Sequence, residues 1–349
     1  MKKIIVAPLN WGLGHATRCI PIIQGLLDNG FEPVIASDGV ALELLKKEFP
    51  KLISFELPSY DIQYAVKGKN FKWKMIAQLP KIISTIKKER NKINKIIEAY
   101  NFDGIISDNR LGVYSKDVPS VFITHQLNVL TGNTSWFTTK LHKKYIQKFN
   151  ECWVPDVENG QNLSGKLGHP TELIGNVKYI GPLSRLCKKP MPIKYDLMVL
   201  LSGPEPQRTI LEQKIISQLE KYPKKVVFIK GVIEKNQTKI EKGNVTYFNF
   251  MNSKELETTF NESNHILCRS GYTTVMDLAK LNKKAFFIPT PGQYEQEYLA
   301  KKFDNSGIIP TCKQEKFTIQ KLNKIELYKG FQNYTTKQNW NKIFSVFNN

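Results

Sequence analysis

The chain has 349 residues, of which 51 are Lys or Arg and 31 are Asp or Glu, giving a formal net charge of +20. Hydrophobic residues make up 41% of the sequence, which suffices for ordinary globular cores and excludes wholesale disorder. The length predicts two domains, and no apolar run reaches the roughly eighteen residues of a membrane span. The five cysteines lie far apart without a C-x-x-C pair, which excludes a disulfide framework and a cysteine zinc site and indicates a reducing, cytoplasmic location.

The first half of the chain alternates between predicted strands and helices. A buried strand is predicted over residues 3–7, followed by a glycine-rich turn and a helix over 16–28. The later elements continue this alternation, with strands over 33–37, 52–57, 104–107 and 118–124 and a helix over 40–49. Strands separated by helices are typical of a parallel sheet covered on both faces, so we expect an α/β fold.

The segment between Tyr60 and Tyr100 is strongly basic. Apart from one step of seven over Arg90, its apolar residues recur at steps of three or four, which predicts one buried face of a helix disturbed by Pro80: Ile76, Leu79, Ile83, Ile86, Ile93 and Ile97. Lysines occupy the other face, and aromatic residues precede the helix: Lys81, Lys87, Lys88, Lys92, Lys95, Phe71 and Trp73. This composition suits an anionic membrane surface, so residues 67–95 are a candidate membrane contact. A stripe of this kind more often packs against a domain core.

The alternation weakens after Asp156, where Gly and Pro are dense, and restarts at Tyr195. The second half predicts strands over 195–201, 226–229, 245–248, 265–268 and 285–288, and helices over 208–219, 253–260, 273–281 and 295–303. We therefore expect two tandem Rossmann-like, doubly wound domains with a ligand-binding cleft between them. The expected divisions are residues 1–178, a linker over 179–194, residues 195–335 and a terminal helix over 336–349.

The turn after the first strand contains Gly12, Gly14 and His15. Two glycines let the backbone approach a ligand closely, and the next helix directs its positive end toward the same place. His15 suits general-base chemistry near neutral pH, or it caps the helix. The turn also resembles a dinucleotide fingerprint that lacks its third glycine, with Asp38 as a candidate ribose ligand.

Two further side chains at strand ends are candidates for the same site. Asp108 ends the strand over 104–107, and parallel strands deliver their carboxyl ends to one edge of the sheet. We expect Asp108 to orient His15 and to raise its basicity. His125, at the end of the following strand, is a rival base, although a structural role bonded to backbone is the commoner one for such a histidine.

A second motif follows a strand of the second half and opens a helix: Arg269, Ser270, Gly271, Thr273, Thr274 and Asp277. Its small residues offer backbone N–H groups and hydroxyls to a diphosphate at the helix N-terminus, and Asp277 suits the hydroxyls of a ribose. Gln296 and Glu297 lie at the next helix start, where their side chains suit sugar hydroxyls. No D-x-D sequence occurs, so we expect no metal and no cofactor; helix dipole and arginine would neutralise a leaving diphosphate.

Together these motifs resemble those of glycosyltransferases with the GT-B fold, and most closely family 28, typified by the enzyme that adds N-acetylglucosamine to lipid I in peptidoglycan synthesis. The resemblance is carried by the glycine–histidine loop near His15, by R-S-G-x-x-T-x-x-D from Arg269 to Asp277, and by the Gln296–Glu297 pair. It spans nearly the whole chain and is strongest over residues 268–300, and it implies that the terminal helix over 336–349 returns to the first domain. It implies an enzyme of cell-envelope glycan synthesis, cytoplasmic and peripheral on the membrane.

The resemblance also implies roles for individual residues. His15 matches the histidine near the acceptor hydroxyl, Asp277 falls where the family has a ribose-binding Glu, and Arg185 resembles an arginine that contacts donor phosphate. Gln296 and Glu297 match a Gln-Gln pair that reads the donor sugar. Phe250 or Met251 falls near the loop whose backbone reads uracil. The family's Gly-Gly-Ser-Gln loop is replaced by residues 202–207, which contain two prolines that lack N–H donors.

The leading hypothesis is therefore an inverting, metal-independent glycosyltransferase that uses a nucleotide-diphosphate sugar, with UDP as the expected nucleotide. Its acceptor would be a glycan or a lipid-linked sugar, and no nucleic-acid partner is expected. One alternative is a sugar-nucleotide 2-epimerase of the same architecture, and a weaker one is an NAD-dependent oxidoreductase. A carbohydrate or lipid binder without catalytic activity is a fourth possibility.

Overall fold

The computed structural model describes residues 1–60, 78–129, 135–172, 175–332, 334 and 338–348, which fall into two compact units. The first unit contains the described residues up to Leu183 and those from 338 onward, and the second contains 184–334. The chain thus passes from one unit to the other within the segment expected as a linker. Phe71, Trp73 and Ile76, which carried part of the membrane hypothesis, lie outside the described residues.

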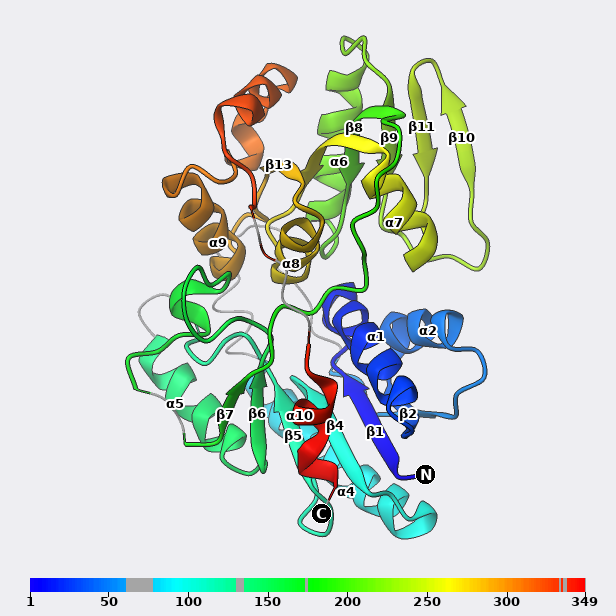
Figure 1. Cartoon of the computed structure of the whole chain (residues 1–349), viewed down its shortest axis with the longest axis vertical. Helices are drawn as coiled ribbons and strands as arrows, with labels where there is room; N and C mark the ends of the chain where they lie inside the picture. The colour runs from blue at the N-terminus through cyan, green and yellow to red at the C-terminus, as the bar shows by residue number, and fades with distance from the viewer. Residues whose placement is uncertain (61–77, 130–134, 173–174, 333, 335–337, 349) are drawn as a thin grey trace. The chain divides into compact units, whose positions relative to one another are not determined.

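The first unit is built on a seven-stranded parallel sheet in the order β3-β2-β1-β4-β5-β6-β7 (Figure 1). Its strands are β1 (Lys3–Pro8), β2 (Glu32–Ser37), β3 (Ser54–Glu56), β4 (Gly104–Asp108), β5 (Ser120–Ile123), β6 (Glu151–Val154) and β7 (Val177–Tyr179). The strand order reverses between β1 and β4, and Pro8 is paired with Asp108 across that junction. Ligands of doubly wound sheets bind at such a reversal, beyond the carboxyl ends of the strands.

The helices of the first unit are α1 (Leu13–Asp28), α2 (Gly39–Glu48), α4 (Leu79–Tyr100) and α5 (Ser135–Ile146). In α4 the stripe predicted as a core face holds in part, because Ile86, Ile93 and Ile97 are buried. Ile83 was wrongly included, since it is 46% exposed, while Ile96 is buried. Pro80 does not disturb the helix, because it lies in the first turn, where a missing N–H costs nothing.

Among the described residues of the first unit, one α-helix and two strands escaped the sequence analysis: α5, β6 and β7. β7 has only three residues, all partly buried, so neither its length nor its pattern gives a strand signal. β6 is a short buried strand of four residues, whose periodicity does not distinguish it from a buried helix. The region read as irregular therefore completes one edge of the sheet.

The second unit contains a six-stranded sheet in the order β10-β11-β9-β8-β12-β13. Its strands are β8 (Tyr195–Leu200), β9 (Val226–Ile229), β10 (Lys239–Lys242), β11 (Val245–Phe248), β12 (Ser263–Cys268) and β13 (Lys284–Phe287). Its helices are α6 (Gln207–Leu219), α7 (Ser253–Asn261), α8 (Tyr272–Leu281) and α9 (Tyr294–Asn305), with a 3-10 segment over Ile319–Leu327. Only β10 is antiparallel, and it was not predicted because all four of its residues are exposed at the sheet edge. The α/β class with two Rossmann-like units is confirmed.

The terminal segment, α10 (Trp340–Ile343) and the 3-10 turn Phe344–Phe347, packs on the first unit (Figure 1). A Cβ atom at Gly25 of α1 would lie 2.8 Å from the Trp340 ring, and one at Gly104 of β4 would lie 2.4 Å from the Phe347 ring. Lys2 Nζ donates to the Phe347 carbonyl over 2.7 Å. The two glycines therefore leave the room that these aromatic rings fill.

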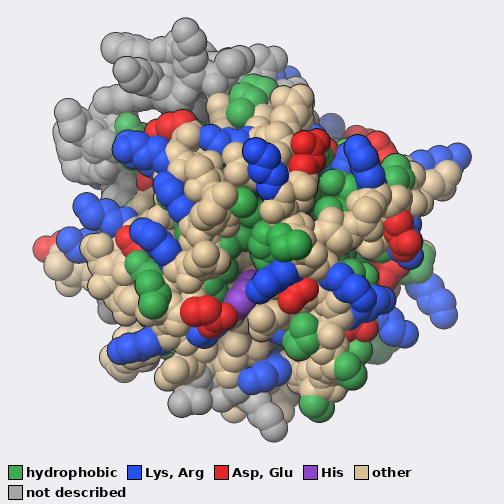
Figure 2. Space-filling view, turned by 90° about the horizontal axis from the view of Figure 1, so that it is seen from above, with side chains coloured by type: hydrophobic (Ala, Val, Ile, Leu, Met, Phe, Trp, Pro, Cys, Tyr) green, Lys and Arg blue, Asp and Glu red, His purple; other side chains and the backbone are tan. Residues whose placement is uncertain are grey.

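The large positive charge is dispersed on the face shown in Figure 2, where Lys and Arg side chains alternate with acidic and apolar ones. Among the described residues, no helix combines the length and the apolar character that crossing a bilayer requires.

Candidate active site

The turn between β1 and α1 presents His15 in the first turn of the helix. Gly12 is the N-cap residue with φ of 80°, a left-handed conformation that favours glycine, and α1 begins at Leu13. No side chain caps this helix end. The alternative that His15 serves as a helix cap is therefore wrong, and its imidazole is left to make other contacts.

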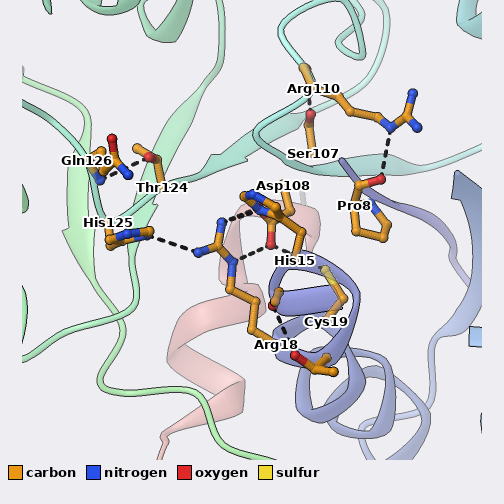
Figure 3. Close-up of polar contacts among 12 residues, drawn as sticks. Pro8, His15, Arg18, Cys19, Ser107, Asp108, Arg110, Thr124, His125 and Gln126 are labelled. Carbon is orange, nitrogen blue, oxygen red and sulfur yellow. Dashed lines mark hydrogen bonds and ion pairs between the residues drawn. The ribbon is translucent and has the colours of Figure 1, made fainter. Parts of the chain in front are cut away.

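His15 and Asp108 lie together as expected from the strand order (Figure 3). The distance between His15 Nδ1 and Asp108 Oδ1 is 2.7 Å, with the imidazole 15% exposed and the carboxylate fully buried. A carboxylate offers only lone pairs, so the proton of this bond belongs to His15 Nδ1. The other ring nitrogen, Nε2, then carries a lone pair and is the atom able to accept a proton.

The sequence analysis missed Arg18, which lies three residues after His15 on the same face of α1. Its side chain is 2% exposed. Arg18 Nε donates to Asp108 Oδ2 over 2.5 Å, and Nη2 donates to Asp108 Oδ1. A third bond of 3.0 Å joins Arg18 Nη1 to His125 Nδ1. The only available signal was that Arg18 stands near the place of the missing third glycine.

Burial and charge set the protonation of this cluster. Burial alone would raise the pKa of the Asp108 carboxyl, but Arg18 and His15 outweigh it and hold the pKa at about 2. Burial lowers the pKa of His15 below its ordinary 6.5; Asp108 opposes that shift, while Arg18 and His125 add to it. A neutral His15 beside an ionised Asp108 is therefore the state at neutral pH, which is the state a general base needs.

Asp38, the candidate ribose ligand of the dinucleotide alternative, is engaged elsewhere. Its carboxylate pairs with the buried Arg110 and accepts a bond of 3.1 Å from Asn10 Nδ2. Arg110 also pairs with the buried Glu89 over 2.6 Å, and Tyr60 donates to that carboxylate. Asp38 thus belongs to a buried charge network beneath the β1–α1 turn, which counts against the oxidoreductase hypothesis.

In the second unit, the turn between β12 and α8 differs from the expected arrangement in two side chains. Arg269 is 1% exposed and donates to the backbone carbonyls of Ile288, Pro289 and Gln207. The Ser270 hydroxyl is buried and donates to the Gln296 carbonyl over 2.8 Å. In this structure Arg269 Nη1 and Nη2 and the Ser270 hydroxyl thus support the backbone of the turn, and their role in donor binding stays a prediction.

The remaining residues of that turn lie at the start of α8. Gly271 is the N-cap, and no side chain caps the helix. Gly271, Thr273 and Thr274 are partly exposed, and a Cβ atom at Gly271 would meet nothing within 4 Å. The first N–H groups of a helix have no intrahelical acceptors, so an uncapped start beside open space is an anion-binding geometry.

Asp277 lies one turn further into α8 and is 7% exposed. Ser184, the first residue of the second unit, donates its hydroxyl to Asp277 Oδ1 over 2.6 Å. Burial raises the pKa of Asp277 to about 6, against the opposing effects of the Arg185 charge and the Ser184 bond. Arg185 is thus close enough to Asp277 to act on it electrostatically.

The other predicted donor-site residues differ in availability. Gln296 accepts from the Thr290 N–H over 2.9 Å and donates to Gln293, so both ends of its amide hold the loop before α9. Glu297 is exposed and accepts from the Gly292 N–H over 2.9 Å. The Phe250 N–H donates to Asn249 and its carbonyl accepts from Gln237, while the Met251 side chain is 9% exposed.

Within the described part of the chain, no group of three or more His, Cys, Asp and Glu side chains is arranged to hold a metal ion.

Comparisons with known proteins find similar sequences for the second unit and for most of the chain. The glycosyltransferase family 28 C-terminal domain matches residues 206–345. The UDP-N-acetylglucosamine–N-acetylmuramyl-(pentapeptide) pyrophosphoryl-undecaprenol N-acetylglucosamine transferase of Haemophilus ducreyi is 22% identical over 92% of this chain and 88% of its own length. An uncharacterized glycosyltransferase of Methanosarcina acetivorans is also 22% identical, over 87% of this chain and 84% of its own.

Solved structures show the same fold at low sequence identity. MurG of Acinetobacter baumannii matches with a TM-score of 0.56 and 13% identity, over 93% of this chain and 90% of its own. The glycosyltransferase SnogD from Streptomyces nogalater matches with a TM-score of 0.61 and 11% identity, over 93% and 90%.

Proposed function

Because this chain is a family 28-like glycosyltransferase with the GT-B fold, we propose that it transfers a sugar from a nucleotide diphosphate, UDP in the first instance, to an acceptor hydroxyl. The observation that carries the proposal is the His15–Asp108 pair at the strand-order reversal of the first unit. The Haemophilus ducreyi relative is by name a transferase that uses UDP-N-acetylglucosamine. That name supports the choice of nucleotide and of the first donor to test.

His15 acts as the general base in this proposal. Its Nε2 lone pair takes the proton of the acceptor hydroxyl while the oxygen forms a bond to the anomeric carbon of the donor sugar. The bond from that carbon to the diphosphate oxygen breaks, and its electrons leave with the nucleotide. Displacement by one attacking oxygen inverts the anomeric configuration. Asp108 holds the imidazole in the required tautomer and stabilises the imidazolium that forms.

The second unit binds the donor in this proposal. The uncapped start of α8 at Gly271 accepts the diphosphate, and the Arg185 charge adds to the neutralisation of the leaving group. Asp277 receives the ribose hydroxyls. The proposal is metal-independent because the sequence contains no D-x-D motif of the kind that chelates a metal–diphosphate complex.

The experiment supplies UDP-N-acetylglucosamine and a polyprenyl-diphosphate-linked sugar and follows UDP release together with the glycosylated product. We expect UDP release that depends on the acceptor, an inverted anomeric centre by proton NMR, and unchanged turnover in EDTA. Retention of configuration would overturn the proposed chemistry. Loss of activity in EDTA that manganese restores would overturn metal independence alone.

The 2-epimerase alternative is tested in the same assay without acceptor. An epimerase converts UDP-N-acetylglucosamine alone to its 2-epimer, whereas the proposed transferase leaves it unchanged apart from slow hydrolysis. Formation of the epimer would replace the proposal by the alternative.

We further propose that the first unit binds an anionic membrane through α4. The apolar stripe of α4 faces the core, and Lys81, Lys87, Lys88, Lys92 and Lys95 are all exposed. A lysine near an anionic surface contributes about 1 kcal/mol.

The test is sedimentation with phosphatidylcholine vesicles, with and without phosphatidylglycerol. We expect binding only to the anionic vesicles, and a loss of roughly tenfold or more in Lys87→Glu/Lys88→Glu, since two charges are reversed. Lys221→Glu/Lys224→Glu, a pair of exposed lysines in the second unit, is the matched control. Equal losses in both variants would contradict a specific role for α4.

A further inference from the structure

Arg18 contacts every polar group that faces His15. The groups around that imidazole are Asp108 from β4, Arg18 from its own helix and His125 from the loop after β5 (Figure 3). Cys19 is a weaker neighbour, with its Sγ 3.6 Å from Asp108 Oδ2. Within this group the Arg18 guanidinium lies between the carboxylate and the second histidine.

The bonds of Arg18 determine which nitrogen of His125 carries a proton. A guanidinium has only donors, so the 3.0 Å contact between Arg18 Nη1 and His125 Nδ1 requires a lone pair on Nδ1. A neutral imidazole has one protonated nitrogen, so His125 carries its proton on Nε2. His125 is therefore a hydrogen-bond donor at Nε2 and has no lone pair there with which to act as a base.

His15 has the opposite arrangement. Its Nδ1 donates to Asp108, which leaves the lone pair on Nε2. Arg18 Nη2 also lies 2.9 Å from His15 Nδ1, but the contact with Asp108 Oδ1 is shorter, at 2.7 Å, and only a proton on Nδ1 satisfies it, so the carboxylate decides the tautomer of His15. The Arg18 guanidinium thus orients Asp108, which sets the tautomer of His15, and it sets the tautomer of His125 by direct contact.

We propose that Arg18 is a positioning residue that holds the two histidines in opposite tautomers, with a lone pair on His15 Nε2 and a proton on His125 Nε2. The conclusion that His15 rather than His125 is the base rests on the proposed function. The two tautomers themselves follow from the contacts alone. A planar guanidinium has donors in several fixed directions, and a lysine ammonium in the same place does not reproduce that fork.

Arg18 also keeps the base uncharged. It neutralises Asp108, so that the carboxylate orients His15 without making it an imidazolium at neutral pH. With Arg18 removed, Asp108 faces His15 alone, and the protonated form of His15 becomes more favourable. The rate of a reaction that needs neutral His15 then rises with pH over a higher range than before.

The direct test is nitrogen-15 NMR of the imidazoles in the unmodified protein, which distinguishes protonated from unprotonated ring nitrogens. Spectra of His15→Gln and His125→Gln assign the two rings. We expect an unprotonated Nε2 in His15 and an unprotonated Nδ1 in His125 near neutral pH. The same tautomer in both rings, or the reverse assignment, would overturn the proposal without any Arg18 variant.

The variants Arg18→Met and Arg18→Lys test whether Arg18 causes the pattern. We expect His125 to become a mixture of tautomers in both. In Arg18→Met we also expect the acidic limb of the pH profile of turnover to move to higher pH. Turnover should then fall by about tenfold or more at neutral pH and recover in part at alkaline pH. Unchanged imidazole spectra in a folded Arg18 variant would overturn the proposal.

Arg110→Met is the matched control, because Arg110 is an equally buried arginine of the first unit that pairs with Asp38 and Glu89. It should lower stability and leave both imidazole spectra unchanged; altered spectra here would mean that any buried arginine has the effect. Failure of the proposed function is recognised separately. If His15→Ala keeps full turnover while the tautomers still depend on Arg18, the base assignment fails and the positioning role remains.

Discussion

Asp108, at the end of β4, and Asp277, in the middle of α8, are both buried carboxylates, yet their pKa values lie far apart, at about 2 and about 6. Burial raises the pKa in both cases. Asp108 overcomes it through two bonds from Arg18 and one from His15, whereas Asp277 has the Ser184 hydroxyl bond and the electrostatic effect of Arg185. The difference lies in the partners and not in the degree of burial.

This contrast separates two ways of building a site. In the first unit, charged side chains satisfy one another, so the arrangement around His15 is complete before any ligand binds. In the second unit, Arg269, Ser270 and Gln296 support the backbone of the turns, and Asp277 retains a carboxylate that is costly to ionise. A ligand that donates hydrogen bonds to Asp277 would offset that cost. Under the proposed function, the first site is arranged for chemistry before a ligand binds, and the second gains stability on binding.

Asp108→Asn should produce the largest effect of these predictions. It leaves the buried Arg18 guanidinium without a countercharge, and breaking such a pair costs about 3–5 kcal/mol. We expect that loss of unfolding free energy by urea denaturation at pH 7, together with at least a hundredfold loss of turnover.

The pH dependence provides the check on that prediction. The folded pKa of Asp108 is below its ordinary 3.8, so its stabilising effect is complete above about pH 4 and is lost as the pH falls toward 2. The curves of the two proteins should therefore converge in acid. Cys19→Ala is the control, because it removes only the weak Sγ contact with Asp108. If Asp108→Asn lost less than about 1 kcal/mol of unfolding free energy, the Arg18–Asp108 pair would not be needed for stability.

His15→Ala should lower turnover by roughly a hundredfold or more with nucleotide affinity nearly intact, since general bases contribute 10²–10⁴. Steady-state kinetics and UDP calorimetry on one preparation measure both. The turnover of the unmodified enzyme should rise with pH through a single ionisation below the ordinary histidine value, because burial lowers the pKa of His15. A fully active variant would remove His15 from the mechanism and would leave Asp108 as the remaining candidate.

Asp277→Asn should stabilise the protein and weaken nucleotide binding. The folded pKa of about 6 lies above the ordinary 3.8, so ionisation penalises the folded state as the pH rises through this interval. At pH 8 we expect the variant to be more stable by about 3 kcal/mol, with no difference below about pH 4. UDP affinity should fall by about 1–3 kcal/mol in calorimetry. A variant that binds UDP normally would exclude Asp277 from the nucleotide site.

Ser184→Ala should have the smallest effect. It removes the hydroxyl that favours the ionised form of Asp277, so the pKa of Asp277 should rise further. One hydrogen bond to a charged group contributes about 1.5–3 kcal/mol to stability. The loss in this variant should be smaller, because Asp277 can become neutral when the hydroxyl is removed. Carboxyl carbon NMR during a pH titration measures the shift, and a fall in the pKa would contradict the contrast with Asp108.

The sequence predicted the fold through its strongest periodicities. β1, β4 and β9 are short apolar runs between helices, and such runs were located to within two residues. The elements that were missed, such as β7 and β10, are short or exposed and gain their order from the neighbouring strand. In α4, Ile83 was predicted to be buried but is exposed, and Ile96 was not predicted but is buried, because the apolar spacing does not determine which edge of the stripe packs on the sheet.

At the site, strand order alone brought His15 and Asp108 together, since both positions follow from the edge where parallel strands end. Arg18 was beyond such reasoning because its role depends on a buried side chain crossing to β4 and to the loop after β5. The inward bonds of Arg269 and Ser270 were not predicted for a related reason. A motif predicts where the backbone turns, but it does not tell which donors turn inward to support that backbone.

The return of residues 340–347 to the first unit affects how the protein is made. The seven strands of the first sheet have all left the ribosome long before Trp340 and Phe347 are synthesised, and the surfaces at Gly25 and Gly104 stay uncovered in the meantime. At about 5–20 residues per second, the interval lasts roughly ten to thirty seconds. The described residues of the second unit, 184–334, are contiguous in sequence and can fold within that interval. The unit that is synthesised first is therefore completed last, and during this delay its apolar surface is open to chaperones or to aggregation.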